Sequence, residues 1–214
     1  MAKNKSSRKA LTGRVALVAG ATRGAGRGIA RALGEAGAMV YCTGRSVKGK
    51  PSPYKRPETI DETAAIIKAA GGKAIARRVD HTNEKEVKAL FRRILRAHTR
   101  LDIVVDSVAG EDPLMGLYGY LWQADLTKAD AIYRQGLTSR IITAKHAALA
   151  MMPAKRGLLV EVTENDMMGG GGNPHAANRE GSLRGDQRRT VTGSWPSARG
   201  SAPKKRSRSP VAPS

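Results

Sequence analysis

Three glycines, Gly20, Gly24 and Gly26, lie between an apolar run and the start of an amphipathic segment in the stretch VAGATRGAGRGIARAL. Glycine lets a backbone turn tightly and approach a phosphate group closely, and the free N–H groups at the start of the following helix favour an anion. The pattern therefore predicts a nucleotide-phosphate site. The alternative is a purely structural turn, because ordinary turns also collect glycine.

Apolar runs alternate with amphipathic segments on both sides of this turn, from residue 14 to residue 166. The runs predict five strands, at 14–20, 38–44, 73–80, 101–110 and 157–166. The amphipathic segments predict helices at 25–37, 60–72, from Asn83 onward, and across 126–152, with capping pairs at Thr59/Glu62 and Asn83/Glu86. Strands that alternate with helices predict an α/β fold with a doubly wound parallel sheet of the Rossmann type.

Several of these stretches together resemble the short-chain dehydrogenase/reductase family over residues 12–172. They are the spacing Gly20-x-x-x-Gly24-x-Gly26, Asp80 after the third predicted strand, LDIVVDSVAG at 101–110 and GLLVEVTEND at 157–166. The resemblance implies a dinucleotide cofactor in the crevice at the carboxyl ends of the strands. It implies that Thr22, Asp80, His81 and Ala109 contact this cofactor together with the three glycines, Asp80 being similar to the family's adenine-contacting acid.

Two arginines indicate which of the two nicotinamide dinucleotides the chain would prefer. An acidic residue at the end of the second strand would hold the ribose 2′-hydroxyl of NAD, but this sequence has CTGRS there, with Arg45 as the first charged residue. Arg23 supplies a second cation immediately before Gly24. Because paired arginines bind a phosphate strongly, the sequence favours NADP(H) over NAD(H). The alternative is that both side chains are simply solvated.

The family's catalytic pair has no counterpart in the sequence. The resemblance implies a Tyr that acts as general acid and base, with a Lys four residues later on the same helix face. None of the five tyrosines is followed by Lys at that spacing, and the family's positions fall near Ala177 and Gly181.

Other residues at the strand ends depart from the family pattern as well. The position of the catalytic serine is taken by Glu164, with Thr163 as the nearest hydroxyl, and Asp106 replaces an asparagine. Thr163 and Glu164 are therefore weak catalytic candidates, and Glu161 is a further acid at the same strand end. A carboxyl with a raised pKa can serve as an acid or a base, but acids at a strand end are more often solvated.

These observations imply one function and leave an alternative open. The resemblance implies an NADP(H)-dependent oxidoreductase that acts on a carbonyl or an alcohol, with impaired turnover in this chain. The alternative is a non-catalytic NADP-binding protein. The substitutions at the strand ends are compatible both with altered chemistry in a divergent subgroup and with relaxed constraint.

Residues 169–214 contain few large apolar side chains among many Gly, Ser, Pro and Arg residues. Such a segment cannot bury enough surface to offset its ordering entropy, so we expect it to be disordered. The predicted organisation is a basic extension at 1–12, a dinucleotide-binding domain at 13–168 and a basic tail at 169–214. The sheet is expected to be incomplete at its C-terminal edge, and a frameshift or truncation near 172–174 is one hypothesis for the abrupt change.

The formal net charge of +20 is concentrated outside the predicted core. Three segments, 1–12, 45–58 and 173–214, together hold fifteen of these charges. Basic runs bind phosphate backbones, so nucleic-acid binding through the tail is a remote alternative. Trp195 is the only aromatic residue in the tail, and stacking side chains are otherwise missing there.

Remaining features limit the class of protein further. Cys42 is the single cysteine and cannot form an internal disulfide, and no apolar run approaches the ~18 residues that a membrane span needs. We expect a cytoplasmic protein without a membrane partner. No metal site is predicted, because His146 and His175 lack partners at ligand spacing. Expected partners are NADP(H), a small carbonyl or alcohol substrate, and a second copy of the chain, the last weakened if C-terminal elements are missing.

Overall fold

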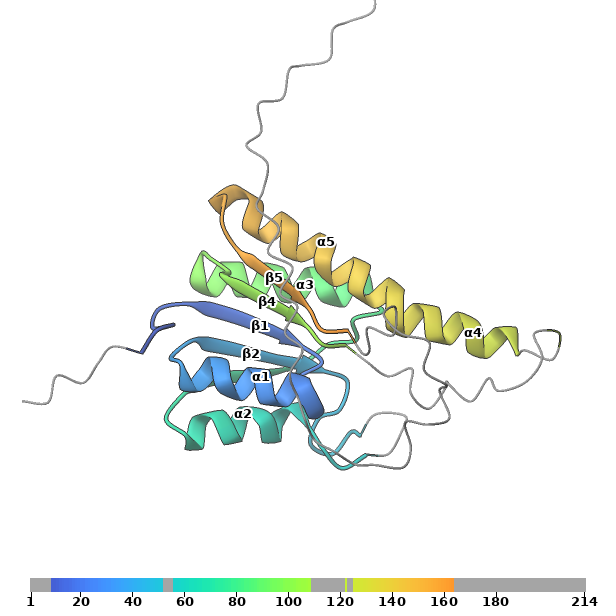
Figure 1. The fold of residues 1–214 in the computed structure, drawn as a ribbon, viewed down its shortest axis with the longest axis horizontal. Coiled ribbons are helices and arrows are strands. Elements are labelled where there is room, and N and C mark those ends of the chain that lie inside the picture. The colour runs from blue at the N-terminus through green and yellow to red at the C-terminus, as the bar shows by residue number, and fades with distance from the viewer. Residues whose placement is uncertain (1–8, 52–55, 109–121, 123–124, 164–214) are drawn as a thin grey trace, which may run out of the picture.

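The computed structural model describes residues 9–51, 56–108, 122 and 125–163. Five parallel strands form one sheet in the order β3-β2-β1-β4-β5 (Figure 1). The strands are β1 (Val15–Ala19), β2 (Met39–Gly44), β3 (Lys73–Arg78), β4 (Ile103–Asp106) and β5 (Leu158–Glu161). All five lie within the runs that the sequence predicts as strands.

Helices cover both faces of this sheet. One face carries α1 (Gly24–Glu35) and α2 (Ile60–Ala69), while α3 (Glu84–His98) and α5 (Ser139–Met151) pack together on the other face (Figure 1). Successive strands are added on one side of β1 as far as β3 and then on its other side from β4, so β1 has β2 as one neighbour and β4 as the other. The predicted doubly wound parallel sheet is confirmed, and its crevice lies at the carboxyl ends of β1 and β4.

Two apolar clusters explain why the strands read as continuous hydrophobic runs. All five residues of β1 are buried, because helices cover the sheet above and below. Successive side chains alternate between the faces, so that Leu17 packs with Phe91 and Ile94 on the α3 face while Val18 packs with Ile67 on the α2 face.

The helix predicted over 126–152 is divided in the structure. It consists of α4 (Leu126–Tyr133), a π-helical turn at Arg134–Thr138, and α5, with a 3-10 turn at Met152–Ala154. A π-turn accommodates one extra residue in an otherwise continuous helix and is common at functional sites. Gly136 lies within it, and its weak helix propensity lowers the cost of leaving regular α geometry.

Both predicted helix starts are present, but the acidic partner has a second role in each. The Thr59 hydroxyl accepts a hydrogen bond from the Glu62 N–H at 3.1 Å, while the Glu62 carboxylate pairs with Arg27 of α1. Asn83 accepts from the Glu86 N–H, while the Glu86 carboxylate accepts from the Asp80 N–H at 2.9 Å. These carboxylates tie each helix start to a neighbouring segment, and the Glu86 carboxylate also accepts from the Asn83 side-chain amide at 3.2 Å.

Residues upstream of the predicted domain start at residue 13 already contact the folded domain. Leu11 packs, partly buried, against the cluster on the α1 face, and its N–H donates to the Ala36 carbonyl at 2.8 Å. The predicted boundary at residue 12 therefore stays a prediction, with Leu11 in contact with the core.

Within the described ranges, no helix has the length and apolarity needed to cross a bilayer.

Asp102 fastens the amino end of the sheet. Its carboxylate accepts from the Val15 N–H and from Arg14, both at 3.0 Å, and from Arg100. Burial opposes ionisation, but the hydrogen bonds from Arg100, Val15 and Arg14 hold the pKa of Asp102 below its ordinary value. One carboxylate thus joins β1 to the start of β4.

We expect Asp102→Ala to lower the free energy of unfolding by about 2 kcal/mol, because it leaves the buried Val15 N–H without an acceptor. Urea unfolding followed by circular dichroism measures this loss. Arg31→Ala removes only an exposed pair with Glu35 within α1 and is the matched control, with an unchanged midpoint. Equal midpoints for both variants would contradict the role given to Asp102.

Candidate functional site: a dinucleotide crevice

The turn after β1 depends on two glycines that leave no room for a side chain. Gly20 has φ +76°, and a Cβ there would lie 2.2 Å from the Ser107 carbonyl oxygen. A Cβ on Gly26 would lie 2.2 Å from the Gly20 carbonyl oxygen. The turn, the residue after β4 and the start of α1 therefore meet backbone to backbone, as a crevice that admits a pyrophosphate requires.

The start of α1 suits an anion. Arg23 occupies the N-cap position with no side-chain cap in the described structure, and the first turn holds no acidic residue. Gly24 begins the helix with φ +53°, a conformation that favours glycine. First-turn N–H groups without a capping side chain, next to an arginine, attract negative charge.

Thr22 positions the turn relative to β2. A Cβ on Gly44 would lie 2.7 Å from the Thr22 hydroxyl oxygen, so the two residues pack closely. The Thr22 carbonyl accepts from Arg27 at 3.0 Å. The Ala21 N–H in the same turn donates to the Thr43 carbonyl at 3.0 Å. The phosphate turn and the end of β2 are thereby held against each other.

Arg45 and Asp80 lie at the ends of β2 and β3, which are neighbouring strands. Asp80 accepts hydrogen bonds from the N–H and the hydroxyl of Thr82, at 2.9 and 2.7 Å. Partial burial opposes ionisation, but these bonds and the charge of Arg45 hold the pKa of Asp80 below its ordinary value. A cation and a carboxylate thus lie beside the place that the family resemblance gives to the adenosine.

His81 has a structural environment that its sequence position did not indicate. The imidazole is buried, with Nε2 2.9 Å from the Thr43 hydroxyl and Nδ1 2.9 Å from the Thr143 hydroxyl of α5. Burial lowers the pKa of His81 to about 4, so the ring is neutral. The side chain joins β2 to α5, and its contact with a cofactor stays a prediction.

Two carboxyl groups face α5 at the ends of β4 and β5. Asp106 and Glu161 are paired in register on neighbouring strands. Asp106 is fully buried, and its Oδ2 atom has no hydrogen-bond partner among the described residues. Burial raises the pKa of Asp106 to about 6 against the opposing effects of the Val108 N–H, Arg140 and Thr143. Burial and the charge of Asp106 raise the pKa of Glu161 to about 7.

Arg140 of α5 completes this cluster. Its guanidinium donates to the Val162 and Val108 carbonyls, at 2.8 and 3.1 Å, and lies 3.6 Å from the Glu161 carboxylate. It thus holds together the segments that leave β4 and β5. A carboxyl that titrates near pH 7 at such an edge has the acidity of an acid–base group. Sequence reasoning named Glu161 but missed Arg140, because no local pattern marks it.

Of the three remaining predicted site residues, the structure describes Thr163 alone. Thr163 is exposed beyond the end of β5. Ala109 and Glu164 lie outside the residues that the structure describes, as does the predicted tail at 169–214.

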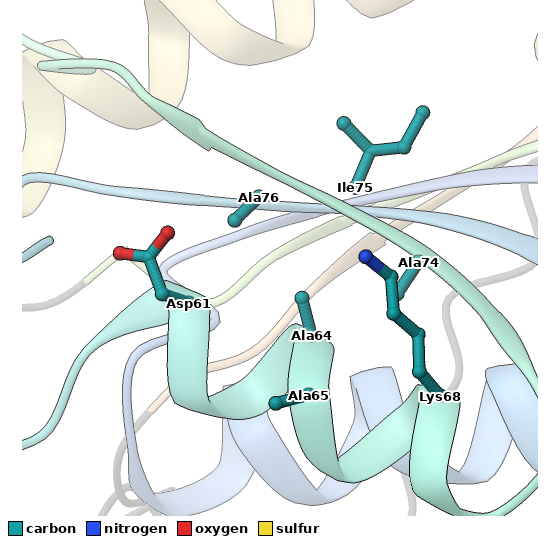
Figure 2. Close-up of a pocket in the computed structure, with 7 residues that line it drawn as sticks. All are labelled: Asp61, Ala64, Ala65, Lys68, Ala74, Ile75 and Ala76. Atoms are coloured by element: carbon teal, nitrogen blue, oxygen red, sulfur yellow. The ribbon is translucent and has the colours of Figure 1, made fainter. Parts of the chain in front are cut away.

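A separate hollow of about 340 Å³ lies between α2 and β3 (Figure 2). Figure 2 shows it lined mainly by alanines, with Asp61 and Lys68 as its charged residues. It flanks the edge of the sheet opposite β5, and its lining includes neither the turn glycines nor Asp106 and Glu161.

A parallel sheet in this order, with a glycine turn after β1 at the point where the strand order reverses, is typical of α/β folds that bind dinucleotides. The family model for short chain dehydrogenase matches residues 14–174, and the chain belongs to this family.

Curated relatives match most of this chain. Dehydrogenase/reductase SDR family member 1 of Mus musculus is 34% identical over 156 residues, which are 72% of this chain and 47% of that protein. The hydroxynaphthalene reductase-like protein Arp2 of Metarhizium robertsii is 32% identical over 79% of this chain and 58% of its own length. The chain thus spans about half the length of the curated relatives it matches.

Solved structures agree with the fold. A metagenomic short-chain oxidoreductase in complex with NADP has a TM-score of 0.62 and 30% identity, covering 73% of this chain and 64% of the other. A short-chain type dehydrogenase/reductase from Mycobacterium ulcerans has a TM-score of 0.61 and 26% identity, covering 72% of this chain and 52% of the other.

We expect Gly26→Ala to abolish dinucleotide binding, because its methyl group would collide with the Gly20 carbonyl and open the turn. Gly28→Ala is the matched control two residues later, where an added Cβ meets open space within α1. It should stabilise the chain by about 0.5–1 kcal/mol and keep binding. Cofactor titration with thermal unfolding tests both variants, and binding by Gly26→Ala would contradict this account of the turn.

The carboxyl cluster predicts a pH dependence of stability. The folded chain keeps a proton on Asp106 up to about pH 6, whereas an unfolded chain releases it near pH 4. The folded state therefore binds more protons in this window, and this contribution to stability is complete below about pH 4 and is lost as pH rises through about 6.

Asp106→Asn removes this titration. The free energy of unfolding of Asp106→Asn, minus that of the unmutated chain, should rise between pH 4 and pH 7 in urea titrations. Gly28→Ala, which changes no titratable group, should give a flat difference over the same range. A flat difference for Asp106→Asn would show that Asp106 ionises normally.

Proposed function

We propose that this chain binds NADP(H) in the crevice at the carboxyl ends of β1, β2 and β4, as an oxidoreductase-family member with impaired turnover of carbonyl or alcohol substrates. The observation that carries the proposal is the turn at Gly20 and Gly26, where backbone occupies the space that any side chain would need. Dinucleotide-binding α/β folds use glycines in this turn for the tight change of direction and for close packing of the helix against the strand.

Charge supports NADP(H) over NAD(H). The residue after β2 is Arg45, and the stretch from Thr43 to Ser46 contains no acid that could hold a ribose 2′-hydroxyl. Arg23 at the N-cap of α1 adds a second cation to the same edge. Two guanidinium groups favour the extra phosphate of NADP(H) through charge-assisted hydrogen bonds. The NADP complex of the metagenomic oxidoreductase is consistent with this preference.

The proposal of impaired turnover rests on the amino-acid sequence. Its five tyrosines lack a lysine four residues later, so the family's proton donor has no counterpart in this chain. Glu161 has the raised pKa of an acid–base group, but its carboxylate is paired with Arg140. A non-catalytic NADP-binding protein is therefore the second candidate function.

Self-association belongs to the same proposal. The outer side of α4, the π-turn and α5 exposes Tyr133, Leu137 and Ile141 at intervals of four residues. Such an apolar stripe is typical of a surface that another chain covers.

Binding and turnover are tested separately on the full chain. Isothermal titration should show NADP⁺ binding more tightly than NAD⁺ by about tenfold or more, as one added phosphate contact between charged groups predicts. Oxidation of NADPH is then followed at 340 nm with a panel of aldehydes, ketones and quinones.

The outcomes separate the two candidates. Binding with slow but saturable turnover supports the impaired oxidoreductase, while binding without turnover on any substrate supports the non-catalytic protein. Absence of binding to both dinucleotides would overturn the proposal in either form.

A further inference from the structure

Gln135 contacts Arg45, although the two residues are ninety positions apart in the sequence. The Arg45 Nη2 atom donates a hydrogen bond to the Gln135 Oε1 atom at 2.8 Å. Gln135 belongs to the π-turn between α4 and α5, whereas Arg45 follows the last residue of β2. The contact therefore joins the helical layer to the strand end that carries the cation of the crevice.

Arg45 is held on a second side by electrostatics. Its charge contributes to the lowered pKa of Asp80, so the guanidinium lies near the carboxyl group that follows β3. Arg45 is half-buried and Gln135 is half-buried. The guanidinium is thus placed between the end of β3 and the π-turn, within the edge of the sheet where the adenosine is proposed to bind.

The chemistry of the two side chains gives this contact a consequence for binding. An arginine recognises a phosphate best when its plane is fixed, because two parallel N–H groups then meet two phosphate oxygens. Fixing a free arginine costs side-chain entropy that reduces affinity. A neutral amide oxygen orients the guanidinium without adding negative charge, whereas a second carboxylate beside that of Asp80 would compete with the phosphate.

We propose that Gln135 is a specificity-determining positioning residue, which orients Arg45 toward the 2′-phosphate of NADP(H) and thereby sets the preference over NAD(H). This inference rests on the proposed NADP(H) binding. Gln135 acts through Arg45, so its effect falls on the cofactor that carries the extra phosphate and spares the one that lacks it.

The first test compares dissociation constants of NADP⁺ and NAD⁺ for the full chain by isothermal titration. Gln135→Met keeps the length of the side chain and removes the acceptor. It should weaken NADP⁺ binding about five- to tenfold and leave NAD⁺ binding within about twofold. Gln135→Glu should weaken NADP⁺ binding further, because its carboxylate pairs with Arg45 and repels the phosphate. Thr138→Ala, an exposed position of the same π-turn, is the matched control with unchanged constants.

A double-variant cycle tests the route of the effect. In an Arg45→Met background, Gln135→Met should cause no further loss of NADP⁺ affinity. Thermal unfolding of each variant without cofactor verifies that the fold is kept, and adenosine 2′,5′-bisphosphate against 5′-adenosine monophosphate repeats the comparison without the nicotinamide.

Each outcome has one meaning. Equal weakening of NADP⁺ and NAD⁺ by Gln135→Met would assign Gln135 a structural role and overturn the inference. A preference for NADP⁺ that Gln135→Met leaves intact would overturn the inference alone, with the proposed function standing. An unmutated chain that binds neither dinucleotide would overturn the proposed function and this inference with it.

Discussion

The backbone contact between the turn after β1 and the residue after β4 is the constraint on which the site depends. Gly20 approaches Ser107 so closely that its hydrogen atom is the largest substituent that fits, and Gly26 meets Gly20 in the same way. This contact fixes the spacing of β1 and β4 where the strand order reverses. The crevice is therefore a property of the backbone, and the side chains around it only determine what it selects.

Those side chains divide the crevice into two regions of different charge. On the β2 and β3 side, Arg45, Asp80 and Gln135 form a polar set around a cation. On the β4 and β5 side, burial raises the pKa of Asp106 and of Glu161, although the nearby Arg140 opposes this effect. The residues proposed to recognise the cofactor and the two carboxyl groups with raised pKa thus lie on opposite sides of β1, so substitution of one set leaves the other in place.

The sequence predicted the parts of this molecule that depend on local patterns. Periodicity located the five strands, and Gly20 and Gly26 marked the turn because their role is conformational. Long-range partners escaped prediction, since nothing in a sequence states that Arg45 will meet Gln135 or that His81 will lie between two threonines. The π-turn was missed for a related reason. The apolar residues of the whole segment 126–152 are spaced nearly as in a regular helix, and this spacing does not mark one extra residue.

The π-turn has a consequence at the level of the gene. It contains one residue more than a regular helix of the same span, so loss of a single codon within 134–138 would restore uninterrupted α geometry while keeping both flanking helices. Because the wide turn already absorbs the extra residue, α4 and α5 would keep their relative orientation after such a deletion, and only the side chains of the turn would be repositioned. The side chain facing the end of β2 would change without any substitution there. Insertion and deletion, more than point mutation, can therefore redirect this part of the crevice during divergence.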